Sequence, residues 1–183
     1  MIEVKKTAVL LYPQFSEYEL SVALSILMQG NKPIVTVGLN NKSCIKGESG
    51  LSCLADIQLC EVNLEEFDSL LLPGCLDIMT LVDAQELIDF IRKMSSTGAI
   101  IASISSSPYL LAKAGVLKGK NYTVGLSLEG MKQLGVFDLN YYSEDLIVQD
   151  GPIITARGRG FIQFGVAFGK ALQLNFDENW YQA

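Results

Sequence analysis

Three consecutive serines, Ser105, Ser106 and Ser107, follow the apolar run at 99–104 and precede Pro108. Many α/β proteins present a nucleophile where a buried strand turns sharply into a helix. A serine hydroxyl at such a bend needs a general base to remove its proton, and the usual base is histidine. The chain contains no histidine. The pattern therefore indicates either a nucleophile with an unusual base or a tight turn without chemistry.

Both interpretations of this bend have a physical basis. Small hydroxyl residues before a proline can satisfy the first amides of the following helix, which requires no catalysis. A carboxyl group is conceivable as the base because burial can raise its pKa toward neutrality. A lysine is the other conceivable base, but Lys113 and Lys118 are expected to face away from the bend.

Apolar runs and helical spacings alternate along the chain and predict one α/β domain over residues 1–183. The predicted strands are 7–12, 34–38, 65–74, 99–104, 145–149 and 152–156, and the predicted helices are 17–29, 83–95, 108–115 and 161–174. Residues 43–60 are predicted to form a hairpin or an excursion at the sheet edge, and the segment after Lys120 is predicted to be less regular. The expected fold is a three-layer sandwich with a mostly parallel, flavodoxin-like sheet.

Composition limits the function classes. The 183 residues carry a formal net charge of −6, which disfavours nucleic-acid binding because that affinity comes largely from lysine and arginine. No apolar run approaches the ~20 residues that cross a bilayer, so we expect no membrane association and a cytoplasmic location. The four cysteines have no metal-ligand spacing, and they are predicted to be reduced and mostly buried. No metal or cofactor is expected.

Ligands of parallel sheets collect where loops leave the carboxyl ends of the strands. The loops to consider are 13–19, 74–80 and 105–108. In the first of them, Ser16 and Glu19 have the spacing of a capping box at the start of a helix. Glu19 is therefore either a helix-capping residue or a group of the ligand site.

Four stretches together resemble the ThiJ/PfpI family of the class I glutamine amidotransferase-like superfamily, the group of the Parkinson-associated deglycase and intracellular protease I. They are FSEYEL, LLPGC, AIIASISSSPYLLAKAGVLKGK and DGPIITARGRGFIQFG, in the family's order. The resemblance covers residues 7–172. It implies the sandwich fold, a homodimer and a site for a small molecule.

The resemblance also implies a nucleophile position with altered chemistry. Family members usually place a cysteine at the bend, where this chain has Ser105, and protease-like members follow it with a histidine, where this chain has Ser106. An acidic residue of the first helix contacts that nucleophile in many members, and Glu19 matches it better than Glu17. A serine cannot form the thiolate that a cysteine forms near neutral pH.

The remaining matched positions concern substrate binding. The family's paired glycines after the third strand read Gly74 and Cys75 here, and Arg157 with Gly158 resembles the family's Arg-Gly turn near the end of the sheet. Cys75 is either a displaced thiol nucleophile or a small packing residue. Arg157 is either a substrate ligand or part of a surface or dimer salt bridge.

Three functions remain open at this stage. The chain is predicted to be a family member with a degenerate nucleophile position that binds a small molecule or has weak activity. The first alternative is a cofactor-free hydrolase, hydratase or glyoxalase/deglycase-like enzyme that uses Ser105 and Glu19, with Gly74, Cys75, Ser106 and Arg157 binding the substrate. The second alternative is a chaperone-like or structural homodimer.

Overall fold

A seven-stranded sheet forms the centre of the computed structural model, which describes residues 4–39 and 43–182. In spatial order the strands are β5 (Ile57–Gln58), β2 (Ile34–Gly38), β1 (Lys6–Leu10), β6 (Phe67–Leu72), β7 (Ile100–Ile104), β9 (Ile153–Ala156) and β8 (Ile147–Asp150). Every neighbouring pair is parallel except β8 and β9, which form an antiparallel hairpin. The central strands β1, β6 and β7 are almost wholly buried, as expected of strands covered on both faces.

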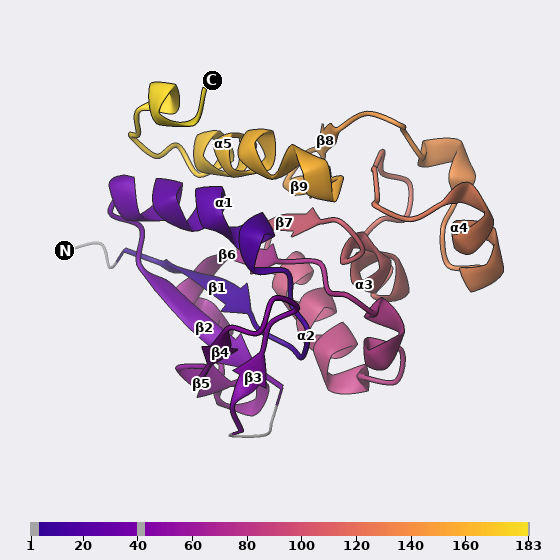
Figure 1. Ribbon diagram of the computed structural model, residues 1–183, viewed down its shortest axis with the longest axis horizontal. Helices are drawn as coiled ribbons and strands as arrows, with labels where there is room; N and C mark the ends of the chain where they lie inside the picture. The colour runs from indigo at the N-terminus through magenta and orange to yellow at the C-terminus, as the bar shows by residue number, and fades with distance from the viewer. Residues whose placement is uncertain (1–3, 40–42, 183) are drawn as a thin grey trace.

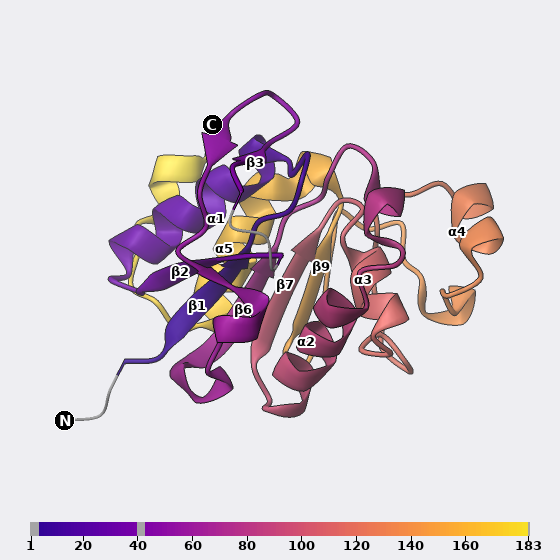
Figure 2. The same ribbon diagram turned by 90° about the horizontal axis from the view of Figure 1, so that it is seen from below.

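Helices cover both faces of this sheet. The helices are α1 (Glu17–Gln29), α2 (Gln85–Ser96), α3 (Pro108–Lys113), α4 (Leu128–Leu134) and α5 (Phe161–Ala171). Figures 1 and 2 show α1 and α5 side by side on one face, and α2 and α3 on the other. The predicted three-layer α/β sandwich with a mostly parallel, flavodoxin-like sheet is confirmed.

Short 3₁₀ helices complete the secondary structure. They are η1 (Leu59–Glu61), η2 (Leu64–Glu66), η3 (Ile78–Leu81), η4 (Leu139–Tyr141), η5 (Gly158–Gly160) and η6 (Glu178–Tyr181). No helix within the two described ranges is both long and apolar enough to cross a membrane.

The excursion predicted at 43–60 divides into two parts. β3 (Ile45–Lys46) and β4 (Ser52–Cys53) pair as a small antiparallel hairpin, and β5 returns to the edge of the main sheet beside β2. Backbone hydrogen bonds from Gln14 to Lys46 and from Glu48 to Phe15 attach the hairpin to the loop after β1. The hairpin therefore lies against the start of α1.

One local prediction is wrong. Ser16 precedes α1 as predicted but forms no side-chain cap, because its hydroxyl donates to Glu48 while the carboxylate of Glu19 binds the amide of Gly74. α4 lies in the segment predicted to be less regular; it has only seven residues, and Met131 alone of them is buried. A helix this short gives no apolar periodicity for a sequence to reveal.

The cysteines also differ from expectation. Only Cys75 is buried, whereas Cys44 and Cys60 are exposed and Cys53 is partly exposed. Cys44 and Cys53 lie in or beside the β3–β4 hairpin, outside the main core. A two-stranded hairpin has little interior in which to bury a thiol.

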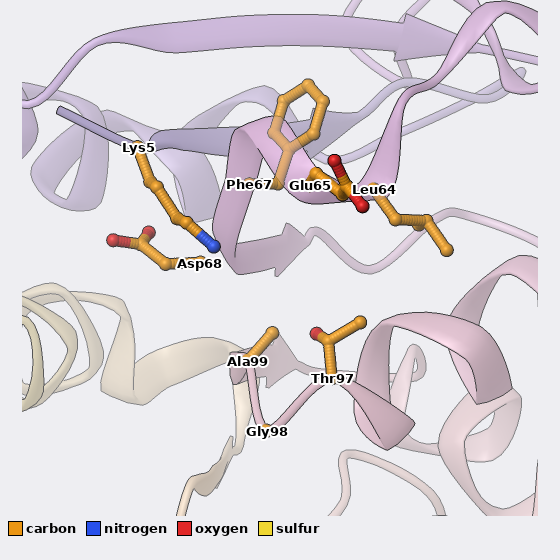
Figure 3. Close-up of a pocket in the computed structure, with 8 residues that line it drawn as sticks. All are labelled: Lys5, Leu64, Glu65, Phe67, Asp68, Thr97, Gly98 and Ala99. Atoms are coloured by element: carbon orange, nitrogen blue, oxygen red, sulfur yellow. The ribbon is translucent and has the colours of Figure 1, made fainter. Parts of the chain in front are cut away.

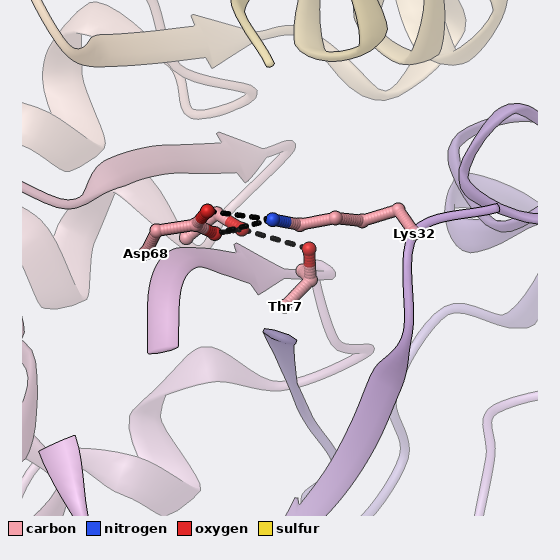
Figure 4. A network of polar contacts seen from close by, with 4 residues as sticks. Thr7, Lys32 and Asp68 are labelled. Atoms are coloured by element: carbon pink, nitrogen blue, oxygen red, sulfur yellow. Dashed lines mark hydrogen bonds and ion pairs between the residues drawn. The ribbon is translucent and has the colours of Figure 1, made fainter. Parts of the chain in front are cut away.

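A polar network holds the strands at the end of the sheet where β1 and β6 begin. Nζ of Lys32 lies 2.7 and 2.6 Å from the two carboxylate oxygens of Asp68, and the Ser69 hydroxyl donates to Asp68 and contacts Thr7 at 2.7 Å (Figure 4). The Lys32 side chain is only 7% exposed, so its charge is partnered rather than hydrated. This network lies at the opposite end of β1 and β6 from the predicted ligand loops.

Candidate functional site

Ser105 follows directly after β7 and has a left-handed backbone. Its φ angle is 64°, a conformation that glycine adopts easily and serine rarely. Two backbone hydrogen bonds hold it there: its N–H donates to the carbonyl of Ala156 at 2.8 Å, and its carbonyl accepts from the N–H of Gly125 at 2.6 Å. A strained residue persists only where its surroundings enforce it, and such residues concentrate at functional sites.

Gly125 shapes this bend from a segment in which the sequence analysis found no candidate. A β-carbon at Gly125 would lie 3.0 Å from both Cα and the carbonyl carbon of Ser105. Only a glycine lets the two backbones approach closely enough for their hydrogen bond. A glycine in an irregular segment gives no sequence signal of such a role, because the contact depends on the tertiary fold.

Glu19 lies beside Ser105, as predicted from the resemblance. The residue is 2% exposed, and its Oε2 accepts a 2.7 Å hydrogen bond from the N–H of Gly74. Burial raises the pKa of this carboxyl group above its usual value, while interactions with Gly74, the Ser105 hydroxyl and Tyr18 oppose the rise. A carboxyl group with a raised pKa is a better proton acceptor than an ordinary one.

Two glycines make room for this pair. A β-carbon at Gly74 would lie 2.7 Å from Oε2 of Glu19 and 2.7 Å from Cβ of Ser105. A β-carbon at Gly158 would lie 2.8 Å from Oε1 of Glu19 and 3.2 Å from Oγ of Ser105. Loops after β6 and β9 therefore approach the pair without a side chain between them. The three predicted loops do converge here, together with the turn at Gly158.

Ser106 and Cys75 contact each other rather than Ser105. The Ser106 hydroxyl accepts from the N–H of Cys75 at 3.2 Å and lies 3.3 Å from its carbonyl oxygen. Burial, followed by the charge of Asp77, raises the pKa of the Cys75 thiol to about 12. Cys75 therefore stays a thiol at neutral pH, which agrees with its interpretation as a packing residue.

The amides of Gly74 and Cys75 are thus both occupied by side chains. Gly74 donates to Glu19, and Cys75 donates to Ser106. An oxyanion hole works through N–H groups that are directed at the substrate oxygen. In this state of the molecule, neither amide is available for that purpose.

Arg157 lies at the end of β9, next to Gly158. Its guanidinium group hydrogen-bonds to the hydroxyl of Tyr142, lies 5.9 Å from the centre of that ring and reaches the hydroxyl of Thr123 at 3.4 Å. Within residues 4–39 and 43–182, no carboxylate forms an ion pair with Arg157. The alternative of a salt bridge inside one chain therefore has no support, and a role in substrate binding stays a prediction.

The sequence analysis did not single out two further polar residues near Glu19. The Tyr18 hydroxyl donates to Oε1 of Glu19 at 3.2 Å, and Oε1 of Glu48 accepts from the Ser16 hydroxyl at 2.8 Å. The Glu17 carboxylate accepts from the amides of Ser49 and Leu51, which fixes the hairpin that carries Glu48. Nothing in the sequence distinguishes Tyr18 from the other six tyrosines, and the sequence left open the position of the hairpin that carries Glu48.

Two hollows on the surface lie away from Ser105 and Glu19. One of about 240 Å³ lies where β6 and β7 begin, and its lining includes Lys5, Asp68 and Thr97 (Figure 3). A shallower one of about 540 Å³ lies along α5 and is lined by Val166 and Tyr181 among others. The part of the chain that the structure describes contains no group of three residues suited to hold a metal ion.

The comparisons with known proteins decide the family. The family model described as "DJ-1/PfpI family" matches residues 5–171, which is most of the chain. The chain belongs to the DJ-1/PfpI family. The resemblance inferred from the sequence is thereby confirmed.

Curated DJ-1/PfpI relatives cover most of the chain. It is 33% identical over 157 residues to protein dj-1beta of Drosophila melanogaster, a match that covers 85% of this chain and 82% of the relative. It is 27% identical over 155 residues to protein/nucleic acid deglycase 2 of Escherichia coli, covering 84% of this chain and 88% of the relative.

Solved structures of the family share the fold. The crystal structure of Drosophila melanogaster DJ-1beta has a TM-score of 0.76 and 27% identity, and the match covers 94% of this chain and 99% of the other. A DJ-1 superfamily protein of Agrobacterium tumefaciens has a TM-score of 0.85 at 21% identity, with 96% and 94% covered. The second likeness supports the fold alone.

Proposed function

We propose that this DJ-1/PfpI protein binds a small carbonyl compound through Ser105, reversibly and with little or no turnover. The observation that carries the proposal is the left-handed backbone of Ser105 next to the buried Glu19. A serine that only capped α3 would not need this costly conformation, and α3 receives no side-chain cap from Ser107, the residue before it. The left-handed backbone thus supports a role in which the bend presents Oγ of Ser105 to a ligand.

The covalent step is an addition that needs no cofactor. Oγ of Ser105 forms a bond to the carbonyl carbon, and the π bond of the carbonyl breaks toward its oxygen. Glu19 accepts the proton of the Ser105 hydroxyl and returns it to the former carbonyl oxygen. The product is a hemiacetal or hemiketal, and the same steps in reverse release the compound.

Low turnover follows from the groups present. A serine hydroxyl ionises far less readily than a thiol, whose ordinary pKa is about 8.5, and the chain has no histidine to assist it. The amides of Gly74 and Cys75 are also occupied by side chains. Both observations favour reversible capture, and a hydrolase, hydratase or deglycase-like reaction is the second candidate because the Ser105–Glu19 pair remains in place.

Trifluoroacetone is a suitable probe because its electron-poor carbonyl group forms stable adducts with weakly activated hydroxyls. We expect fluorine NMR to show a bound hemiketal signal with the wild-type protein and none with Ser105→Ala. Ser96→Ala removes an exposed hydroxyl from the end of α2 and is the matched control, which should bind like the wild type. An adduct of unchanged intensity in Ser105→Ala would refute the proposal.

The proposal includes a cytoplasmic homodimer, which the family resemblance supports. Light scattering coupled to size-exclusion chromatography measures the mass in solution. A mass near twice the 20.0 kDa of the chain is expected, and a monomer at all concentrations would refute this part.

A further inference from the structure

Three side-chain oxygens surround the backbone of Gly158. A β-carbon built there would lie 2.8 Å from Oε1 of Glu19, 2.9 Å from the hydroxyl of Tyr18 and 3.2 Å from Oγ of Ser105. The two residues of the proposed reaction therefore have a third polar neighbour. Tyr18 plays no part in the function proposed so far.

The ring of Tyr18 is held in a defined orientation. It packs edge-on against Phe161 at the start of α5, with ring centres 5.4 Å apart and an angle of 86° between the ring planes. Its hydroxyl donates to Oε1 of Glu19 at 3.2 Å, a long hydrogen bond that is easily exchanged. The residue as a whole is 47% exposed, so a small molecule can approach it from solvent.

The Tyr18 hydroxyl stays protonated at neutral pH. Burial and the neighbouring charges of Glu19 and Glu48 raise the pKa of this phenol above its ordinary value of 10.0. A phenol in this state is a hydrogen-bond donor at every physiological pH.

We infer that Tyr18 donates a hydrogen bond to the carbonyl oxygen while Ser105 attacks the carbonyl carbon. This inference rests on the proposed function. Negative charge develops on that oxygen before Glu19 returns the proton, and the amides of Gly74 and Cys75 are engaged with other side chains. Tyr18 supplies the donor that they do not. It exchanges its bond to Glu19 for one to the substrate and transfers no proton.

The test compares trifluoroacetone binding by fluorine NMR in the wild type, Tyr18→Phe and Ser105→Ala. Phenylalanine keeps the ring that packs on Phe161 and removes only the hydroxyl. We expect Tyr18→Phe to weaken binding by about two- to tenfold, because the former carbonyl oxygen, a hydroxyl in the neutral adduct, loses one hydrogen bond between uncharged groups. Tyr141→Phe, in η4, removes a tyrosine hydroxyl from another element and should bind like the wild type.

The outcomes separate this inference from the function on which it rests. Weakened binding in Tyr18→Phe at an unchanged melting temperature, with no adduct in Ser105→Ala, supports both. Full binding in Tyr18→Phe with no adduct in Ser105→Ala overturns the role of Tyr18 alone. An adduct that persists in Ser105→Ala overturns the proposed function as well. A role of Tyr18 in folding only would lower the melting temperature and leave the affinity of the folded protein unchanged, which also overturns the inference.

Discussion

The carboxylate of Glu19 accepts a 2.7 Å hydrogen bond from the backbone N–H of Gly74, which links the first turn of α1 to the loop after β6. This contact orients a buried acid next to Ser105. It also uses the amide that the family resemblance assigned to substrate binding. The same hydrogen bond therefore orients the carboxylate of Glu19, opposes the rise of its pKa and occupies the amide of Gly74.

Glu19→Gln is expected to stabilise the fold at neutral pH. Because burial raises the folded-state pKa of Glu19, the folded protein binds this proton more tightly than the unfolded chain does. The protonated carboxyl group of Glu19 therefore contributes to the stability of the folded protein. This contribution is fully present below the unfolded pKa near 4.5 and is lost as pH rises through the higher folded pKa. The free energy of unfolding of Glu19→Gln relative to wild type should accordingly increase with pH above 4.5. Urea unfolding at a series of pH values measures it.

Glu17→Gln is the matched control and has the opposite sign. Burial acts to raise the pKa of Glu17, but hydrogen bonds from backbone amides, including those of Ser49 and Leu51, lower it overall. The ionised carboxylate of Glu17 therefore contributes to the stability of the folded protein at pH values above its unfolded pKa. This contribution is lost when the pH falls through the lowered folded pKa. A Glu19→Gln variant with the same pH trend as Glu17→Gln would contradict the assignment of a raised pKa to Glu19.

The cost of the left-handed backbone at Ser105 can be measured from the free energies of unfolding of two variants. Ser105→Gly and Ser105→Ala both lack the hydroxyl, but only alanine retains the cost of a φ angle of 64°. We expect the glycine variant to be more stable than the alanine variant by about 1 kcal/mol, the order of the left-handed penalty. Equal free energies of unfolding for the two variants would show that the bend is relaxed in solution.

Sequence patterns predicted the sheet, its buried strands and the loops that meet at the site. The family resemblance paired Ser105 with Glu19, and both residues lie directly beside regular elements, at the end of a strand and in the first turn of a helix. The predicted topology placed the loops that carry them at one edge of the sheet, because parallel strands have their carboxyl ends there.

The rest of the site depends on contacts that the sequence does not encode locally. Gly125 reaches Ser105 through its backbone, and Glu48 reaches Ser16 from a hairpin whose position the sequence left open. Glu19 has the spacing of a capping box, but its carboxylate accepts a hydrogen bond from the amide of Gly74 instead of capping α1. Tertiary hydrogen bonds of this kind override local preference, which explains why the predicted cap was wrong.

Cys75 is expected to be inert toward thiol reagents. Its pKa of about 12, raised first by burial, leaves almost no thiolate at neutral pH, and the thiolate is the reactive form. Iodoacetamide followed by peptide mass spectrometry should label the exposed Cys44 well before Cys75. Rapid labelling of Cys75 in the folded protein would restore it as a candidate nucleophile, and Cys75→Ala should otherwise bind trifluoroacetone like the wild type.

Gly158→Ala tests whether the three oxygens must lie together. Gly158 does not have a positive φ angle, so alanine meets no backbone penalty and the change acts through its β-carbon alone. That carbon would lie within 3.0 Å of both Oε1 of Glu19 and the Tyr18 hydroxyl, closer than real contacts allow, so these side chains must leave their present positions. We expect loss of trifluoroacetone binding in a protein that still unfolds cooperatively.

Gly98→Ala, in the turn before β7, is the stability control: its φ of 79° makes alanine costly there, but the change should leave binding intact in the folded fraction. Full binding in Gly158→Ala would mean that the reaction does not depend on the close arrangement of Ser105, Glu19 and Tyr18.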